Sequence, residues 1–191
     1  MKKQPFKEII IGDGLELRRP VLTKDHAEEM FDVLRRNDFF YPWRFSLRDC
    51  KCPDDCMRLI ENRLAAIESM TDAYYDIFVK GAYVGELYAR EIDYVLNEVN
   101  NLGYFVDGQK RGHGIAPKAI LTLEPELWKM GVISIYLFCH FFDPAAPNTA
   151  SEKVAKKCGY KFIKTKPHAI YDKWGDRWAD EHMFRKFCPS K

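Results

Sequence analysis

The sequence lacks hydrophobic runs of membrane-spanning length. Its first residues, MKKQPFKEIIIGDG, include lysines but only three consecutive apolar residues. A signal peptide needs an apolar core of at least about seven residues, and a membrane-spanning helix needs about 20. We therefore expect a cytoplasmic protein that makes no membrane contact.

The sequence also has little net charge, because 30 Lys and Arg residues stand against 28 Asp and Glu residues, a formal balance of +2. Proteins that bind nucleic acid usually show a larger basic excess or a basic run. Neither is present, so we expect no nucleic-acid partner.

Internal repeats and low-complexity linkers are absent from the 191 residues, of which 47% are hydrophobic. A chain of this length and composition can bury one sizeable core. We therefore expect a single domain over residues 1–191.

A metal-binding spacing is missing as well. Cys50, Cys52 and Cys56 cluster in DCKCPDDC, but the sequence offers no fourth ligand and no second ligand pair at a familiar distance. We predict no metal site. The three cysteines fit reduced thiols in a loop and a helix start, as expected in a cytosolic protein.

The elements that are present follow from hydrophobic periodicity and turn signals. They predict, in order, one strand, two helices, three strands, a helix, a strand, a helix and two strands. This order indicates an α/β (α+β) fold with a single mixed, mostly antiparallel sheet flanked by helices. The expected elements are a strand at Leu15–Pro20, a helix ending near Asn37, a helix opening at Asp54 or Asp55, two strands joined at Lys80-Gly81, a strand at Asn101–Val106, a helix after the glycine-rich loop that follows, a strand at Val132–His140, a helix ending at Gly159 and a hairpin turning at Gly175-Asp176.

Three local expectations accompany this order. Pro125 should kink or break its helix near Leu121, because proline removes a hydrogen bond in a helix interior. The nearly all-apolar Val132–His140 should be a strand buried on both faces. Thr149 and Glu152 should form a capping box at the start of the last helix.

The stretch QKRGHGIAPKAI contains the clearest functional signal, a glycine-rich loop that follows a strand and opens a helix. Such a loop can hold a phosphate with its backbone amides. It is not a Walker loop, because no Gly-Lys pair follows Gly108, and not a dinucleotide fingerprint, because Pro117 replaces the third glycine. The alternative is a plain strand-to-helix turn that uses glycine for its geometry.

The remaining pattern, Gln109-x-x-Gly112-x-Gly114, resembles the coenzyme A pyrophosphate loop of the GNAT acetyltransferase superfamily. The resemblance extends over roughly residues 15 to 187, and it is similar to the RimJ/RimL-like branch that acetylates the N-termini of ribosomal proteins. Residues 35 to 77 contain no motif that matches. The matching motifs are GYFVDGQKRGHGIAPKAI, Leu127-Trp128-x-Met130-Gly131, Asn148-x-x-Ser151, Lys157-Cys158-Gly159-Tyr160-Lys161-Phe162 and GDRWADEHMF.

This resemblance implies that acetyl-CoA is the co-substrate and that it binds beside a splayed parallel strand pair. It implies that the backbone of Phe105 and Val106 pairs with the pantetheine arm, to which Asn148 also bonds. The loop residues implied in binding the pyrophosphate are Gln109, Arg111, Gly112, His113, Gly114, Ile115 and Ala116.

For catalysis, the resemblance implies direct acetyl transfer to an amine, with Ser151 protonating or stabilising the leaving thiolate. Ala155 stands where other branches carry a tyrosine for this task. The alternative for Ser151 is a first-turn serine that bonds its own helix backbone.

The sequence offers more than one candidate for the general base. Two positions that often carry an acid in the family hold Asn101 and, as the nearest equivalent, Ile170. Glu98, Glu86 and Asp93 are nearby candidates, and we select Glu98 as the base, acting directly or through a water. The alternative is a solvated carboxylate at a strand start.

The acceptor is expected to be a primary amine, either a protein N-terminus or a small molecule. Tyr41, Trp43 and Phe45, with Glu86, are candidates for its pocket; alternatively, the three aromatics plug the core. Because acids are missing at Asn101 and Ile170, a non-catalytic acyl-CoA-binding module on the same scaffold is the competing hypothesis. A homodimer is compatible with both the acetyltransferase and the non-catalytic module.

Overall fold

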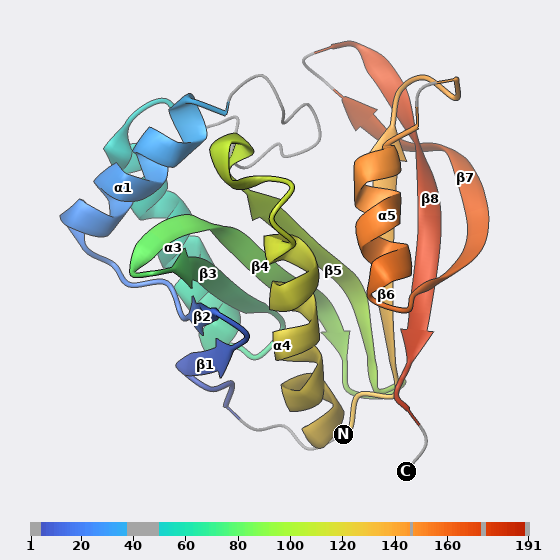
Figure 1. Ribbon diagram of the computed structural model, residues 1–191, viewed down its shortest axis with the longest axis horizontal. Helices are drawn as coiled ribbons and strands as arrows, with labels where there is room; N and C mark the ends of the chain where they lie inside the picture. The colour runs from blue at the N-terminus through green and yellow to red at the C-terminus, as the bar shows by residue number, and fades with distance from the viewer. Residues whose placement is uncertain (1–4, 38–49, 146, 173–174, 190–191) are drawn as a thin grey trace.

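The structure is a computed structural model in which residues 5–37, 50–145, 147–172 and 175–189 are described. In these residues eight strands form one sheet in the order β1-β2-β3-β4-β5-β6-β8-β7 (Figure 1). All neighbouring strands are antiparallel except the parallel pair β5 and β6. The predicted fold class is thus confirmed. The strands are β1 (Ile9–Gly12), β2 (Leu15–Arg18), β3 (Ala73–Val79), β4 (Ala82–Asp93), β5 (Glu98–Val106), β6 (Ser134–Phe141), β7 (Lys161–Asp172) and β8 (Arg177–Phe187).

Helices cover both faces of this sheet (Figure 1). On one face, α4 (Ile115–Lys129) and α5 (Thr149–Lys157) pack on the larger hydrophobic core. On the other face, α1 (Lys24–Arg35) and α3 (Pro53–Glu68) pack together over a smaller core. The two sides of the sheet therefore offer different environments to a ligand that passes between the strands.

The parallel pair separates partway along its length. The hydrogen-bonded register of β5 and β6 ends at Leu102 opposite Leu137, after an irregularity that begins at Val99. Both strands continue beyond this point, and they diverge (Figure 1). We call the diverging segments, 103–106 of β5 and 138–141 of β6, the wedge.

Several local expectations were wrong. The hairpin strand β1 was missed, because its short run IIIG is followed at once by a turn at Gly14, where φ is +73°. Pro125 does not break α4, which runs unbroken from Ile115 to Lys129. Pro125 has no backbone N–H and so cannot make the helical hydrogen bond of its position. The core contacts of other residues in this helix, such as Leu123 and Leu127, outweigh that loss.

Two further corrections affect the site. β6 is not buried on both faces: Ile135, Leu137 and Cys139 are buried, whereas alternate side chains such as Phe138 and His140 are only half-buried. The N-cap of α5 is Asn148 rather than Thr149, because the Asn148 side chain accepts the hydrogen bond from the Ser151 amide at 3.2 Å.

In the part of the chain that the structure describes, no helix is long and apolar enough to cross a membrane.

Candidate active site

The glycine-rich loop joins β5 to α4 with a backbone that only glycine adopts easily. Gly112 and Gly114 have φ angles of +80° and +74°, and Gly114 is the N-cap of α4. A Cβ on Gly112 would meet no atom within 4 Å, so the loop is open to a ligand. The first amides of α4, which have no carbonyl partner within the helix, follow this loop directly, an arrangement that suits a phosphate.

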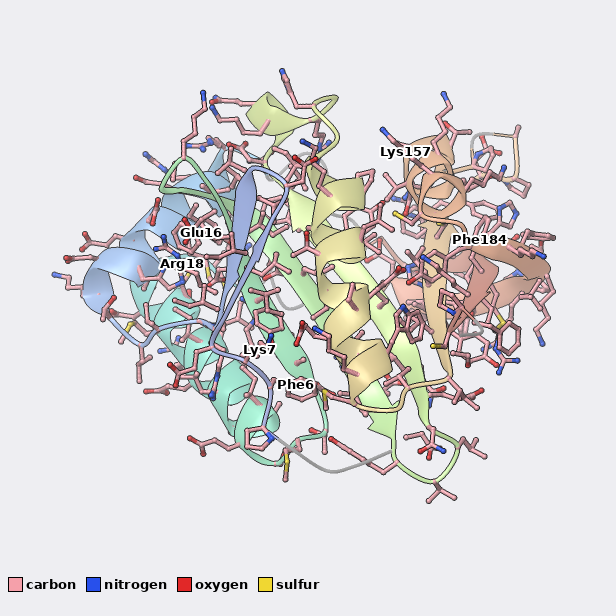
Figure 2. All side chains as sticks on the ribbon, turned by 60° about the horizontal axis from the view of Figure 1, so that its bottom comes forward. Phe6, Lys7, Glu16, Arg18, Lys157 and Phe184 are labelled. Atoms are coloured by element: carbon pink, nitrogen blue, oxygen red, sulfur yellow. The ribbon has the colours of Figure 1, made fainter. Side chains whose placement is uncertain are left out.

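Cationic side chains surround this loop. Lys110, Arg111 and His113 are exposed on it, and the Arg111 Nε donates to the Val106 carbonyl oxygen at 3.2 Å. Besides Lys110 and Arg111, a third cation comes from α5: the Lys157 Nζ lies 4.0 Å from the position that a Cβ on Gly114 would occupy. Figure 2 shows Lys157 on α5 beside the first turn of α4. Sequence reasoning missed it, since the two helices meet only in the folded chain.

The start of the loop is held by the end of α1. The carboxylate of Asp107 is fully buried; it accepts from Arg36 Nη2 at 2.5 Å and from Asn37 Nδ2 at 2.8 Å. The Asn37 Oδ1 in turn accepts from the Gly108 amide at 2.6 Å. Burial alone would raise the pKa of Asp107, but these hydrogen bonds outweigh burial and lower it. The carboxylate is therefore ionised at neutral pH and fixes where the loop begins.

Ser151 lies where the two diverging strands come closest to α5. Its Oγ accepts a hydrogen bond from the Tyr104 hydroxyl of β5 at 3.1 Å and another from the Cys139 thiol of β6 at 3.2 Å. A hydroxyl has one hydrogen to donate. Because both strands donate to this oxygen, the Ser151 hydrogen is directed to an acceptor other than these two partners. A thiolate formed in the wedge would be such an acceptor.

Cys139 is not suited to act as a nucleophile, although it touches Ser151. Burial raises the pKa of its thiol to about 12. A thiol with so high a pKa carries almost no thiolate at neutral pH, and the thiolate is the reactive form. The geometry thus favours direct transfer over an acyl-cysteine intermediate.

On the opposite face of the same strands lies an open hollow of about 690 Å³, which we call the sheet hollow. It contains a hydrogen-bonded pair, His140 of β6 and Glu181 of β8, whose Nε2 and Oε2 are 3.1 Å apart. It also contains both positions at which an acid was missing from the sequence, Asn101 and Ile170. Its lining consists of Glu91, Asn100, Asn101, Tyr136, Phe138, His140, Ile163, Lys164, Lys166, Ala169, Ile170, Glu181, Met183 and Arg185.

The two predicted pantetheine-binding residues differ in orientation. The Phe105 carbonyl oxygen lies only 2.0 Å from where a Cβ on Gly85 of β4 would stand, so it faces β4 and away from the wedge. In a strand, the hydrogen-bonding groups of alternate residues point to opposite sides. The backbone N–H and C=O groups of Val106 and Tyr104 therefore face the wedge. The predicted pairing of the Phe105 backbone with pantetheine is not supported.

Asn148 and the predicted catalytic acids are engaged elsewhere. Asn148 uses its Oδ1 to cap α5, as described above. Glu98 pairs with Arg185 and accepts from the Ser134 hydroxyl at 2.8 Å. It lies six residues before Tyr104, roughly 20 Å along an extended strand. The structure therefore does not bring Glu98 together with Ser151.

The other two carboxylates are also engaged in other contacts, although Glu86 stands opposite Phe105 in the sheet. Glu86 is buried in an ion pair with Arg63 of α3 and does not line the sheet hollow. Asp93 accepts the amides of Val95 and Leu96 in a turn at the far end of β4. The predicted pocket residues Tyr41, Trp43 and Phe45 lie outside the described residues.

Solved structures of acetyltransferases share this fold. RimL, the ribosomal L7/L12 alpha-N-protein acetyltransferase, in complex with coenzyme A, has a TM-score of 0.85 at 18% identity, over 96% of this chain and 100% of that one. The microcin C7 self-immunity acetyltransferase MccE, in complex with acetyl-CoA and AMP, has a TM-score of 0.81 at 20% identity, over 92% and 93%. Mycobacterium smegmatis RimJ, in complex with CoA-disulfide, has a TM-score of 0.79 at 17% identity, over 93% and 85%.

Sequence comparison identifies the family. No curated protein sequence matches the chain. The profile of the acetyltransferase (GNAT) domain matches residues 15–161, well over half of the chain, and agrees with the open loop, the wedge and the strand order. The chain therefore belongs to the GNAT acetyltransferase family, and it is an acetyl-CoA-dependent acetyltransferase.

Proposed function

We propose that the protein transfers the acetyl group of acetyl-CoA directly to a primary amine, either a protein N-terminus or a small molecule. The observation that carries this proposal is the position of the Ser151 hydroxyl, which receives hydrogen bonds from both strands of the wedge. A group held by both strands is well placed to meet a thioester sulfur between them.

The coenzyme would enter from the side of α4 and α5. Its pyrophosphate would bind the amides from Arg111 to Ala116, where the N-terminus of α4 adds partial positive charge. Lys110, Arg111 and Lys157 supply cations around the same point. The pantetheine arm would run along the wedge-facing backbone of β5, with the thioester at Ser151.

The acceptor would approach from the other face, through the sheet hollow. In direct transfer, the amine nitrogen attacks the thioester carbon while the sulfur leaves as a thiolate. The Ser151 hydroxyl donates a hydrogen bond to that thiolate, and amides of the wedge stabilise the oxyanion. Donor and acceptor then meet from opposite sides without exchanging places.

The relatives support an amine acceptor without narrowing its size. RimL modifies the α-amino group of a ribosomal protein, and MccE was solved with AMP beside acetyl-CoA. The sheet hollow is open, and it combines apolar side chains such as Phe138 and Met183 with charged ones. Such a surface suits either a peptide N-terminus or an amine-bearing small molecule.

The test is an acceptor panel with acetyl-CoA as donor. Peptides that begin with Ser, Ala, Thr or Met are compared with free amines such as spermidine and tyramine. Release of the coenzyme thiol is measured together with the mass of the product. We expect at least one amine to gain a single acetyl group at a rate well above thioester hydrolysis. Hydrolysis alone, with no acetylated amine in the panel, would contradict the proposal.

A further inference from the structure

We propose that His140 is the general base that removes the proton from the attacking amine, and that Glu181 is its positioning residue. This inference rests on the proposed function. It answers a chemical need, because a primary amine must lose a proton as its nitrogen becomes an amide. Of the acids predicted from the sequence, Glu98 and Asp93 lie at the far ends of their strands, and Glu86 is buried in an ion pair with Arg63.

The position of His140 follows from the alternation of side chains along β6. Cys139 points toward α5 and contacts the Ser151 hydroxyl at 3.2 Å. Successive side chains of a strand point to opposite faces. His140 therefore points into the sheet hollow, one residue from the point where the thioester sulfur is expected. The base and the Ser151 hydroxyl then lie on opposite sides of the reacting carbon.

The sheet hollow also explains why another residue is needed. Asn101 and Ile170, which replace the acids expected from the family resemblance, both line it. An amide and an alkyl side chain cannot take up a proton at neutral pH. His140 and Glu181 line the same hollow. The general base is therefore supplied at this site by β6, rather than by β5 or β7, which carry Asn101 and Ile170.

The pair has the geometry of a base and its anchor. Glu181 is held in place because its side chain is only 9% exposed, whereas that of His140 is 22% exposed and can reach a ligand. If the His140 Nε2 donates its hydrogen to Glu181, the Nδ1 is the basic nitrogen of the neutral ring. The carboxylate then also stabilises the imidazolium that forms when the ring takes a proton.

In this acetyl transfer, one bond forms as another breaks. The amine nitrogen forms a bond to the acetyl carbon, and the bond from that carbon to the sulfur breaks. The amine proton passes to His140, and the electron pair of the broken bond leaves on the thiolate, next to the Ser151 hydroxyl. The imidazolium then releases its proton to solvent, and the thiolate takes one from solvent. No oxidant or metal takes part.

Several charges around the hollow act on this ring. Glu181 and Glu91 bring negative charge to the hollow, and Lys164, Lys166 and Arg185 bring positive charge. Arg185 is itself paired with Glu98, and its guanidinium stacks on Tyr136. Removing the Glu181 charge should therefore alter the pH profile of kcat/KM, a change that a purely structural role would not produce.

The experiment measures kcat/KM against pH with the best amine of the panel. His140→Gln retains a side chain that can hydrogen-bond to Glu181 but cannot act as a base. We expect kcat/KM to fall about 10²- to 10⁴-fold, the usual effect of removing a general base. The acidic limb of the pH profile should then follow only the protonation of the free amine, while the thermal shift produced by coenzyme A remains.

Two further variants separate catalysis from folding. Glu181→Gln should keep the acidic limb but displace it along the pH axis. His182→Gln removes a matched pair on the other face of β8, where the His182 Nδ1 lies 2.8 Å from Glu152. It should leave the acidic limb in place.

The outcomes are distinct. An unaltered enzyme that acetylates the amine, together with a His140→Gln variant that keeps both its rate and its acidic limb, would overturn the role of His140. If His140→Gln does not fold, an acidic limb that stays in place in Glu181→Gln would overturn it instead. Absence of any acetylated amine with the unaltered protein would instead contradict the proposed function itself.

Discussion

At the scale of single residues, the hydroxyl of Ser151 is the group that the proposed chemistry uses most directly. Replacing Ser151 with alanine removes the hydrogen bond to the leaving thiolate but keeps the cap of α5, because Asn148 binds the backbone amide of this residue. We expect kcat to fall on the order of 10²-fold, as when one donor is removed from an oxyanion site. Steady-state kinetics with the best amine measures this.

The control for this variant is Thr149→Ala, an exposed residue in the same turn of α5. It should leave kcat within about twofold. An unchanged kcat in Ser151→Ala would mean that the serine has only a structural role in its helix, the alternative that the sequence left open.

Lys157 is the second residue with a specific expectation. Its Nζ lies beside Gly114, at the inner end of the phosphate loop. If it contacts the pyrophosphate, Lys157→Ala should weaken coenzyme A and 3′-dephospho-coenzyme A equally, by about three- to tenfold, as expected for one partly exposed ion pair. Calorimetric titration measures both affinities.

Lys153→Ala, an exposed lysine one turn earlier on α5, serves as the control and should change neither affinity. A loss confined to coenzyme A would place Lys157 at the 3′-phosphate instead, and equal affinities for the variant and the unaltered protein would remove it from the site.

At the scale of elements, the end of α1 holds the loop that follows β5. Asn37→Ala removes the acceptor of the Gly108 amide and one donor to the buried Asp107. An unsatisfied buried group costs about 1–3 kcal/mol. In a domain of this size that lowers the melting temperature by several degrees. The affinity for coenzyme A should fall as well, because the loop loses its support.

Arg35→Ala on the exposed side of the same helix is the matched control, since Arg35 pairs only at the surface with Asp32. Calorimetric melts and titrations of both variants give the comparison. A melting temperature of Asn37→Ala equal to that of Arg35→Ala would show that the contact of Asn37 with Gly108 and Asp107 does not stabilise the fold.

The contact between α1 and β3 has a pH dependence of its own. The buried His26 Nε2 lies 2.9 Å from the Asp76 Oδ2. Burial lowers the pKa of His26, but the hydrogen bond and charge of Asp76 outweigh it and raise the pKa above its ordinary value. This pair therefore stabilises the fold fully below about pH 6.5, the value for an unfolded histidine, and the contribution is lost as pH rises through the raised pKa.

The measurement compares melting temperatures of the unaltered protein and His26→Gln at pH 6 and pH 9. The difference between the two proteins should be larger at pH 6. A difference that stays constant, or that grows toward pH 9, would contradict the assignment.

The elements also show which parts of the site the sequence could predict. The position of the glycine-rich loop between a strand and a helix is a local signal, as is the order of the elements from Leu15 onward, and both agree with the structure, whereas β1 was missed. The contacts of Ser151 with Tyr104 and Cys139, the cation Lys157 and the pair of His140 with Glu181 join elements far apart in the chain. They depend on strand register, which local patterns do not give.

The sheet hollow was missed for a related reason. The apolar run of β6 favours burial on both faces, and periodicity does not reveal that α1 and α3 leave the hollow side of β6 open. The expected base, Glu98, follows the motif spacing of β5, but its neighbour across the sheet, Arg185, is set only by the fold.

At the scale of the whole molecule, the proposed acetyl transfer requires two ligands that reach the wedge from opposite faces of a sheet. The larger core under α4 and α5 supports the coenzyme side, and the sheet hollow lies on the other side. Since β5 and β6 separate only past Leu102 and Leu137, the coenzyme should add contacts between two halves of the sheet that otherwise lack them there. Binding should therefore stabilise the whole fold.

The measurement that tests this claim most directly is a thermal melt with and without acetyl-CoA. A ligand at about 100 times its dissociation constant stabilises the native state by about 2.7 kcal/mol. In a domain of this size that corresponds to a rise of about 5–10 °C. We predict such a rise with acetyl-CoA and with coenzyme A, but not with ATP or NAD. No rise at millimolar acetyl-CoA would contradict the assignment of the loop and the wedge.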